Sequence, residues 1–252
     1  MGNQSTIGSQ SIIQSLSHAW DSVKANAWLF AGFTFIYLLI SSILSLIPFL
    51  GSAASLFSFI FSASVFSALN VYDRNRKLDF NEFFSWSPKF GRLFLGNLLL
   101  TVLVVIMLIP FAFILIAILG ISFFTELASN PENIEGLFVG STILILVLAI
   151  LLFVIVVSIA LFAYPYIIQF TDLSYTEALN YSFKIGRNNI GQVVLFAFVA
   201  VGLSILGLIL CGVGLLFTIP IIIATQYYFL HDMISDDEPE ETKWDFMQQT
   251  PE

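Results

Sequence analysis

Charged side chains are scarce in this chain. They make up 10% of its 252 residues, whereas hydrophobic residues make up 58% and phenylalanine alone occurs 27 times. Soluble domains contain roughly 25% charged residues. A fold surrounded by water could not cover its surface with so few charges, so the sequence predicts an integral membrane protein.

Cysteine and histidine are also rare. The single cysteine, Cys211, excludes an internal disulfide and a CxxC site, and the only histidines are His18 and His231. This composition predicts no metal site and no cofactor. The chain has nine Lys and Arg residues, no basic stripe and a pI of about 4.6, which argues against nucleic-acid binding.

The long apolar runs contain no Asp, Glu, Lys or Arg. Ion-coupled transporters and proton relays usually place such groups at membrane depth, so their absence makes these functions less favoured. The most distinctive polar junction is "FAYPYIIQFTDLSYTE" (162–177), where Asp172 could serve as a base but no neighbouring residue reads as its nucleophile or second acid. We therefore predict a protein that is not an enzyme, with no catalytic residues.

Six apolar runs are long enough to span a membrane, which requires about 20 residues each. The first two runs divide at "IPFLGS" (47–52) and the last two at "CGVG" (211–214), where Pro and Gly end helices. We predict a disordered segment at 1–10, a six-span membrane domain at 11–235 and a tail at 236–252. The predicted spans are residues 27–48, 51–72, 93–119, 137–164, 191–210 and 213–230.

With six spans, all nine basic residues lie on one side of the membrane. Loops rich in Lys and Arg stay in the cytoplasm. The sequence therefore predicts a multi-pass protein of the bacterial cytoplasmic (inner) membrane with both termini in the cytoplasm.

A polar motif occurs twice along the chain. "EFFSWSPKFGRLFLGN" (82–97) and "EALNYSFKIGRNNIGQ" (177–192) share Glu, Ser, Lys, Gly, Arg and Gly at the same spacing, and a looser third copy is "LSHAWDSVKANAW" (16–28). Capping boxes are predicted at Asp79-x-x-Glu82 and Ser174-x-x-Glu177. We predict three helical-hairpin repeats in an all-α fold, each preceded by an amphipathic elbow helix, the second of which is bent by Pro88.

Each elbow helix is expected to lie in the headgroup plane with its apolar side towards the lipid. In the first elbow the apolar residues at helical spacing are Ile12, Ile13, Leu16, Trp20 and Val23.

Four basic residues of the two close copies are the candidate lipid contacts: Lys89, Arg92, Lys184 and Arg187. One interpretation is that they set the topology and reach towards headgroups in general. The other is that they form a specific site for an anionic lipid.

The last residues form an acidic tail, because seven of the 17 acidic residues lie within 236–252. Disorder is the expected state of such a segment. Trp244 and Phe246 are candidate anchors through which the tail would bind a basic groove on a soluble or membrane partner.

The elbow "TEALNYSFKIGRNN", followed by "GLILCGVGLLFTIPIIIATQYYFLHDM", resembles a large group of six-span bacterial membrane proteins. This group includes the membrane domain attached to some glycerophosphoryl diester phosphodiesterases. The resemblance covers roughly residues 10–235 and rests on the elbow, the turn in which Gly212 and Gly214 flank Val213, and the aromatic end of the sixth span. It implies the six-span fold. The chain leaves no room for the phosphodiesterase barrel, so no catalytic residues are transferred.

Two functions follow from these observations. The first is a non-enzymatic membrane protein that acts as a scaffold or supports envelope and lipid homeostasis, with membrane lipids as its partners. The alternative is a transporter or channel for a lipid-like or small neutral substrate. A cavity lined by Asn, Gln and Ser at mid-membrane would favour the transporter, whereas a packed centre of Phe and Leu would favour the scaffold.

The predicted topology is tested by a reporter fused at residue 130, between the third and fourth predicted spans. We expect a reporter that is active only outside the cytoplasm to be active there, because that loop carries no basic residue. Activity of a cytoplasmic reporter at the same position would contradict the topology.

Overall fold

The computed structural model describes residues 11–46, 58–129, 147, 161–210 and 212–237. Within these residues every regular element is a helix, as the sequence predicts. The α-helices are α1 (Ile12–Ala25), α2 (Ala27–Ser45), α4 (Ser58–Asn75), α5 (Phe90–Ser129), α7 (Tyr164–Phe170), α8 (Tyr175–Asn188), α9 (Ile190–Ile209) and α10 (Leu215–Asp237), and the two 3-10 helices are η1 (Phe80–Phe84) and η2 (Ser87–Lys89).

Three stretches in this part of the chain are long and apolar enough to cross a membrane. They are Ala27–Ser45, Phe80–Phe113 and Ile190–Ile209, which correspond to α2, the first part of α5 with the turns before it, and α9. α5 has 40 residues and is therefore about 60 Å long, well beyond the predicted span 93–119. The segments 1–10 and 47–52, most of span 137–164 and most of the tail lie outside the described residues.

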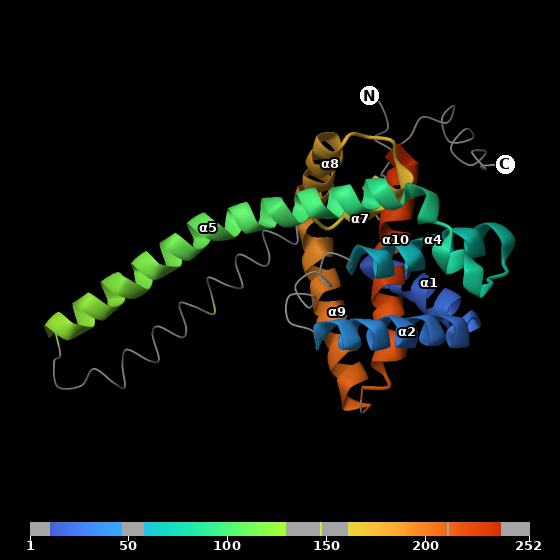
Figure 1. Ribbon diagram of the computed structural model, residues 1–252, viewed down its shortest axis with the longest axis horizontal. Coiled ribbons are helices and arrows are strands. Elements are labelled where there is room, and N and C mark those ends of the chain that lie inside the picture. Colours follow the sequence, from blue (N-terminus) through green and yellow to red (C-terminus); the bar gives the residue numbers. More distant parts are fainter. Residues whose placement is uncertain (1–10, 47–57, 130–146, 148–160, 211, 238–252) are drawn as a thin grey trace, which may run out of the picture.

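α10 is the central helix. It packs against α1, α2, α4 and α9. Four successive residues in its second half, 227–230, are all buried. Figure 1 shows α9 and α10 side by side, α2 lying across them, and α5 running away from the other helices. α2 and α5 are thus not aligned with α9 and α10 as they would be in a simple parallel bundle.

Aromatic rings fill the core between α2, α4 and η1. The ring centroids of Phe33 and Phe83 are 4.5 Å apart, those of Phe30 and Phe83 are 5.2 Å apart, and those of Phe33 and Phe61 are 5.7 Å apart. Stacked and edge-to-face rings at such distances stabilise a fold by about 0.5–1.5 kcal/mol per pair beyond their buried area. The interface between α2, α4 and η1 is therefore packed with Phe.

The first and third copies of the motif fold alike. α1 and α8 each have 14 residues and begin with a capping box, formed by Ser11 with Gln14 and by Ser174 with Glu177. The box at Ser174 confirms the prediction, and the hydroxyl and backbone N–H of Ser174, which both donate to Glu177 Oε2, lower the pKa of the Glu177 carboxyl.

Both helices end at an asparagine. Asn26 has φ −126° and ψ 34°, and Asn189 has φ −121° and ψ 33°. Each side-chain amide donates to the carbonyl four residues earlier, at 3.5 Å for Asn26 to Ser22 and 2.9 Å for Asn189 to Ile185. The next helix begins one residue later, so the same asparagine turn joins α1 to α2 and α8 to α9.

The second copy folds differently, and the predicted capping box at Asp79 is wrong. The Asp79 side chain accepts no capping hydrogen bond at the start of η1, and Pro88 lies in the first turn of η2. Proline lacks the N–H group that a continuous α-helix would use, so this copy forms two short 3-10 turns. Trp86 joins them to α4, because its Nε1 donates to Phe83 O and Ser64 Oγ, both at 2.8 Å.

The predicted lipid-facing side of the first elbow is also corrected. Ile12 and Val23 are buried together with small residues of the same face, whereas Ile13 and Trp20 are 62% and 52% exposed. The reason is that α1 packs along α10, and this close packing uses Ser15, Ala19 and Ser22. The apolar residues of this elbow therefore divide between the protein core and the outer surface.

The predicted break between the last two apolar runs is confirmed. Gly212 has φ +79°, a left-handed conformation that favours glycine. Next to this turn, α9 and α10 approach so closely that a Cβ atom at Gly207 would lie 2.6 Å from Thr218 Oγ1 and 3.1 Å from Leu215 N. The hairpin depends on these glycines.

Replacing Gly207 by Ala should therefore lower the thermal midpoint of the detergent-purified protein. We expect a loss of about 1–3 kcal/mol from overpacking. Gly202→Ala on the same helix is the matched control, because no atom lies within 4 Å of its added Cβ, and a Gly→Ala change within a helix gains about 0.5–1 kcal/mol. Equal midpoints for the two variants would contradict the close packing of the hairpin.

Candidate functional site

A short buried helix, α7, organises the polar groups of the molecule. Pro165 lies in its first turn, where a missing N–H group is tolerated, and Thr171 ends it in an extended conformation. Five of its residues are buried: Tyr164, Tyr166, Ile167, Ile168 and Gln169. The last carbonyls of any helix lack partners within the helix, so a buried helix end must find them elsewhere.

Lys89 and Arg92 supply these partners. Lys89 Nζ donates to Gln169 O at 3.0 Å, Arg92 Nε donates to Ile168 O at 3.1 Å, and Arg92 Nη2 donates to Thr171 O at 2.9 Å and also to Leu173 O. Positive charge at the C-terminus of a helix is favourable as well. Two of the predicted lipid contacts therefore join η2 and the start of α5 to the end of α7.

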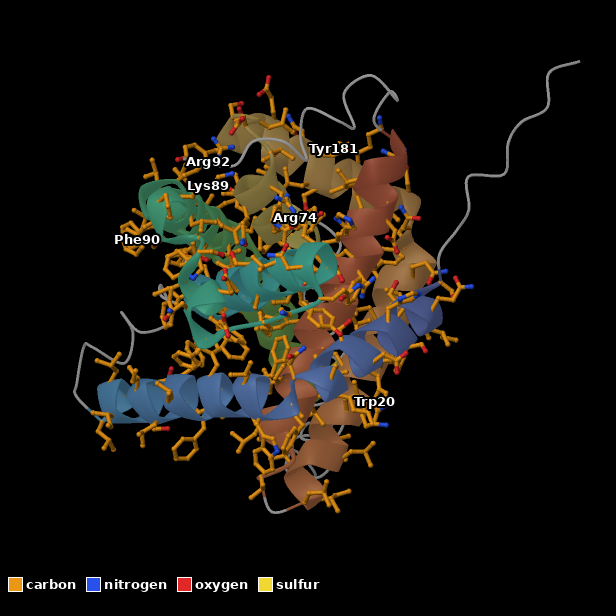
Figure 2. The ribbon with its side chains drawn as sticks, turned by 90° about the vertical axis from the view of Figure 1, so that its right-hand side faces the viewer. Trp20, Arg74, Lys89, Phe90, Arg92 and Tyr181 are labelled. Atoms are coloured by element: carbon orange, nitrogen blue, oxygen red, sulfur yellow. The ribbon has the colours of Figure 1, made fainter. Side chains whose placement is uncertain are left out.

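Figure 2 shows Lys89 and Arg92 close together beside the yellow and gold segment that holds α7 and α8. The Arg92 guanidinium also lies 5.8 Å from the centre of the Tyr175 ring, within the range of a cation–π contact. The other two predicted lipid contacts, Lys184 and Arg187, are exposed on α8. Trp244 and Phe246 lie outside the described residues.

Gln169 ties α7 to α4. It is 3% exposed, and its Nε2 donates to Ala63 O at 3.0 Å and to Ser67 Oγ at 2.9 Å. Its Oε1 is buried and has no hydrogen-bond partner in the described part of the chain. Buried polar atoms of native proteins are usually paired, so this oxygen requires an explanation.

A cavity of about 310 Å³ lies between α4, α5 and α7, and Gln169 forms part of its wall. Ser62, Asn97 and Tyr164 are the other polar lining residues, and the rest of the lining is apolar. Tyr164 donates its hydroxyl to Gly96 O at 3.3 Å, which holds that wall in place. The volume is at the lower end of the range for small-molecule sites, about 300–1,000 Å³.

A second polar cluster joins α1, α4 and α10. Tyr228 donates its hydroxyl to Asp73 Oδ1 at 3.0 Å and lies 2.7 Å from Ser22 Oγ. Burial raises the pKa of the Asp73 carboxyl above its ordinary value, while the hydrogen bond from Tyr228 and the nearby charges of His231, Arg76 and His18 lower it. These groups connect three helices, and no group of three His, Cys, Asp or Glu residues with metal-binding geometry occurs among the described residues.

Sequence reasoning missed both clusters. Ser67 and Asn97 come from two different apolar runs and Gln169 comes from the polar junction 162–177, so no short motif contains all three. The best available signal was the position of Asp73 and Tyr228. Each lies at or near the end of a predicted span, and the predicted topology places both of these ends on the cytoplasmic side of the membrane, where the basic residues lie. Asp172, the candidate base of the polar junction 162–177, is exposed.

The comparisons with known proteins return no match to a family model, a curated protein or a solved structure. The resemblance to the six-span membrane proteins therefore stays a prediction, carried by the motifs of the chain.

The structural role of Arg92 predicts a specific loss of stability in Arg92→Gln. The change withdraws donors from the carbonyls of Ile168, Thr171 and Leu173, which should cost about 1–3 kcal/mol. Thermal unfolding in detergent measures the effect, and Arg187→Gln is the matched control. Because Arg187 is exposed, its replacement should change stability by no more than about 0.5 kcal/mol. A destabilised Arg187→Gln beside an unchanged Arg92→Gln would refute this assignment.

Proposed function

We propose that this chain is a multi-pass protein of the bacterial cytoplasmic membrane that acts as a non-enzymatic scaffold or as a factor in envelope and lipid homeostasis. The observation that carries the proposal is that polar side chains of the described residues form hydrogen bonds between helices. Lys89, Arg92 and Gln169 make hydrogen bonds between helices, and Tyr228 does the same between α4 and α10. Around these bonds the interior is packed with aromatic rings. Such a core holds a fixed shape.

The proposed topology has six spans with both termini in the cytoplasm. Three apolar helical stretches and the hairpin turn at Gly212 support it, together with the restriction of basic residues to one set of loops. The matching elbows α1 and α8 support a repeated hairpin unit. The second elbow would then be a variant of the unit, altered by Pro88.

The outer surface of the first elbow supports contact with lipid headgroups. Trp20 and Trp28 are exposed on either side of the exposed Lys24. Tryptophan and lysine are both favoured where a membrane meets water. The exposed Lys184 and Arg187 on α8 would meet lipid phosphates at the equivalent elbow, and they are the better candidates of the original four for this contact.

The second candidate function is a transporter or channel for a lipid-like or small neutral substrate. The cavity beside α7 favours it, because Ser62, Asn97 and Gln169 give this cavity polar walls. The packed Phe30, Phe33 and Phe83 favour the scaffold. We place the scaffold first because this aromatic packing fixes α2, α4 and η1 against one another.

A scaffold requires a partner, and the acidic tail is the segment proposed to bind it. The test is cross-linking in intact membranes followed by purification of the full chain, the 236–252 deletion, and Trp244→Ala/Phe246→Ala. We expect one protein to be recovered in near-stoichiometric amounts with the full chain and lost with both variants. Gln248→Ala/Gln249→Ala is the matched control, because it keeps the aromatic anchors and the charges.

The same purified protein also distinguishes the scaffold from the transporter. The protein is reconstituted in vesicles, and the flux of labelled lipid and of small neutral solutes is compared with that of empty vesicles. The scaffold predicts no flux above that of empty vesicles. Flux in the absence of any recovered partner would replace the scaffold with the transporter.

A further inference from the structure

The C-terminal ends of α8 and α10 lie side by side. Asn189, the residue that follows α8, donates its side-chain Nδ2 to Met233 Sδ of α10 at 3.5 Å. Met233 precedes Asp237, the last residue of α10, by four residues, which is about 6 Å along the helix axis. Figure 1 shows α8 and the red end of α10 at the same end of the molecule. The chain therefore leaves α10 beside α8, and residues 238–252 start from this point.

This end of α8 is basic. Lys184 and Arg187 are both exposed, and residues three apart in a helix lie on the same face. The single acid of α8 is Glu177, which lies at the other end of the helix and accepts hydrogen bonds from Ser174. Lys184 and Arg187 therefore form an exposed basic pair, and the only opposite charge on their own helix is engaged elsewhere.

The segment that follows α10 has the opposite charge. Residues 238–252 contain five acids and one lysine, and the first three acids are Glu238, Glu240 and Glu241. Because the segment is tethered at Asp237, its effective concentration at a surface as close as α8 is roughly millimolar. Exposed ion pairs are individually weak, but several charges that form a network contribute measurably. Charge and connectivity thus both select this segment as the occupant of the basic pair.

A second basic surface lies farther from the start of this segment. It consists of Arg74, Arg76 and Lys77, which are exposed at the end of α4 and just after it. The hydrogen bond from Tyr228 to Asp73 joins α4 to α10, and Tyr228 precedes the end of α10 by nine residues, or about 14 Å. The corresponding distance for α8 is about 6 Å, so α8 is the nearer surface.

We propose that residues 238–241 dock on Lys184 and Arg187 and exclude lipid phosphates from this pair. The docking follows from the contacts above, whereas the exclusion rests on the proposed function, in which the same pair meets headgroups. Carboxylates and phosphates are both anions that accept charged hydrogen bonds, so they compete for the two cations. Because each exposed ion pair is weak, the docked segment exchanges with competitors. Anionic lipid at high density displaces it, and so does a partner that captures Trp244 and Phe246.

Disulfide trapping tests the docking. Thr242→Cys and Asn188→Cys are combined in a Cys211→Ala background, which places one thiol beside the acids and the other beside the basic pair without removing a charge. The full chain is oxidised with copper phenanthroline in membranes, and the intramolecular disulfide is counted by mass spectrometry. Thr242→Cys with Asn75→Cys is the matched control, because Asn75 is an exposed asparagine of the second basic surface.

The yield of disulfide at position 188 should be at least about fivefold that at position 75. It should fall by a similar factor in Glu238→Gln/Glu240→Gln/Glu241→Gln and in about 1 M salt, where the Debye length is about 3 Å. Trp244→Ala/Phe246→Ala keeps the acids and should keep the yield. Equal yields at the two positions, or a yield that survives the loss of the acids, would overturn the docking.

Native mass spectrometry tests the exclusion of lipid. The probe is dioleoylphosphatidylglycerol, added to the full-length protein in mild detergent, and dioleoylphosphatidylcholine, whose headgroup has no net charge, is the control lipid. The glutamine variant of the three acids and the deletion of 238–252 should each bind at least about threefold more of the anionic lipid. Adding Lys184→Gln/Arg187→Gln should abolish this gain. No gain in either variant, a gain that persists without the two cations, or an equal gain for the control lipid would overturn the exclusion.

The two assays distinguish a failure of the docking from a failure of the proposed lipid contact. If the basic pair does not meet lipid, Lys184→Gln/Arg187→Gln leaves the binding of dioleoylphosphatidylglycerol by the deletion variant unchanged, while the disulfide at position 188 still forms. If the docking fails, that disulfide is no more abundant than the one at position 75, while the basic pair still binds the anionic lipid.

Discussion

The structure depends on how the buried end of α7 satisfies its carbonyl groups. A backbone group that is withdrawn from water and left unpaired is costly, and the last carbonyls of α7 are partly buried. Arg92 and Lys89 reach these carbonyls from α5 and the turn before it. The position of α7 then fixes Gln169 against α4 and Tyr164 against α5, and the cavity forms between these three helices.

This arrangement changes the meaning of the basic residues in the repeated motif. In the second copy, Lys89 and Arg92 are structural, because they are directed at the neighbouring helix. In the third copy, Lys184 and Arg187 are exposed on α8. The basic residues of the same motif therefore lie in two different environments, and the difference arises from what packs beside each copy rather than from the motif.

The local features were predictable from the sequence because their causes lie within a few residues. The capping box at Ser174 and Glu177 and the glycine turn at Gly212 follow from backbone geometry. The buried side of α1 was not predictable in this way. Its selection of Ser15 and Ala19 over Trp20 depends on the close approach of α10, which is remote in the chain.

The candidate site was beyond local reasoning for the same reason. Gln169, Ser67 and Asn97 acquire their roles only when α4, α5 and α7 meet. The scarcity of charge in the apolar runs did predict that polar chemistry within them would rest on amides and hydroxyls.

The central claim is that Arg92 holds α7 in place, and amide hydrogen exchange of this helix tests it most directly. The account predicts strong protection of residues 164–171 in the wild type and in Arg187→Gln. It predicts faster exchange of these amides in Arg92→Gln, with protection of α10 retained. Unchanged protection of α7 in Arg92→Gln would contradict the account.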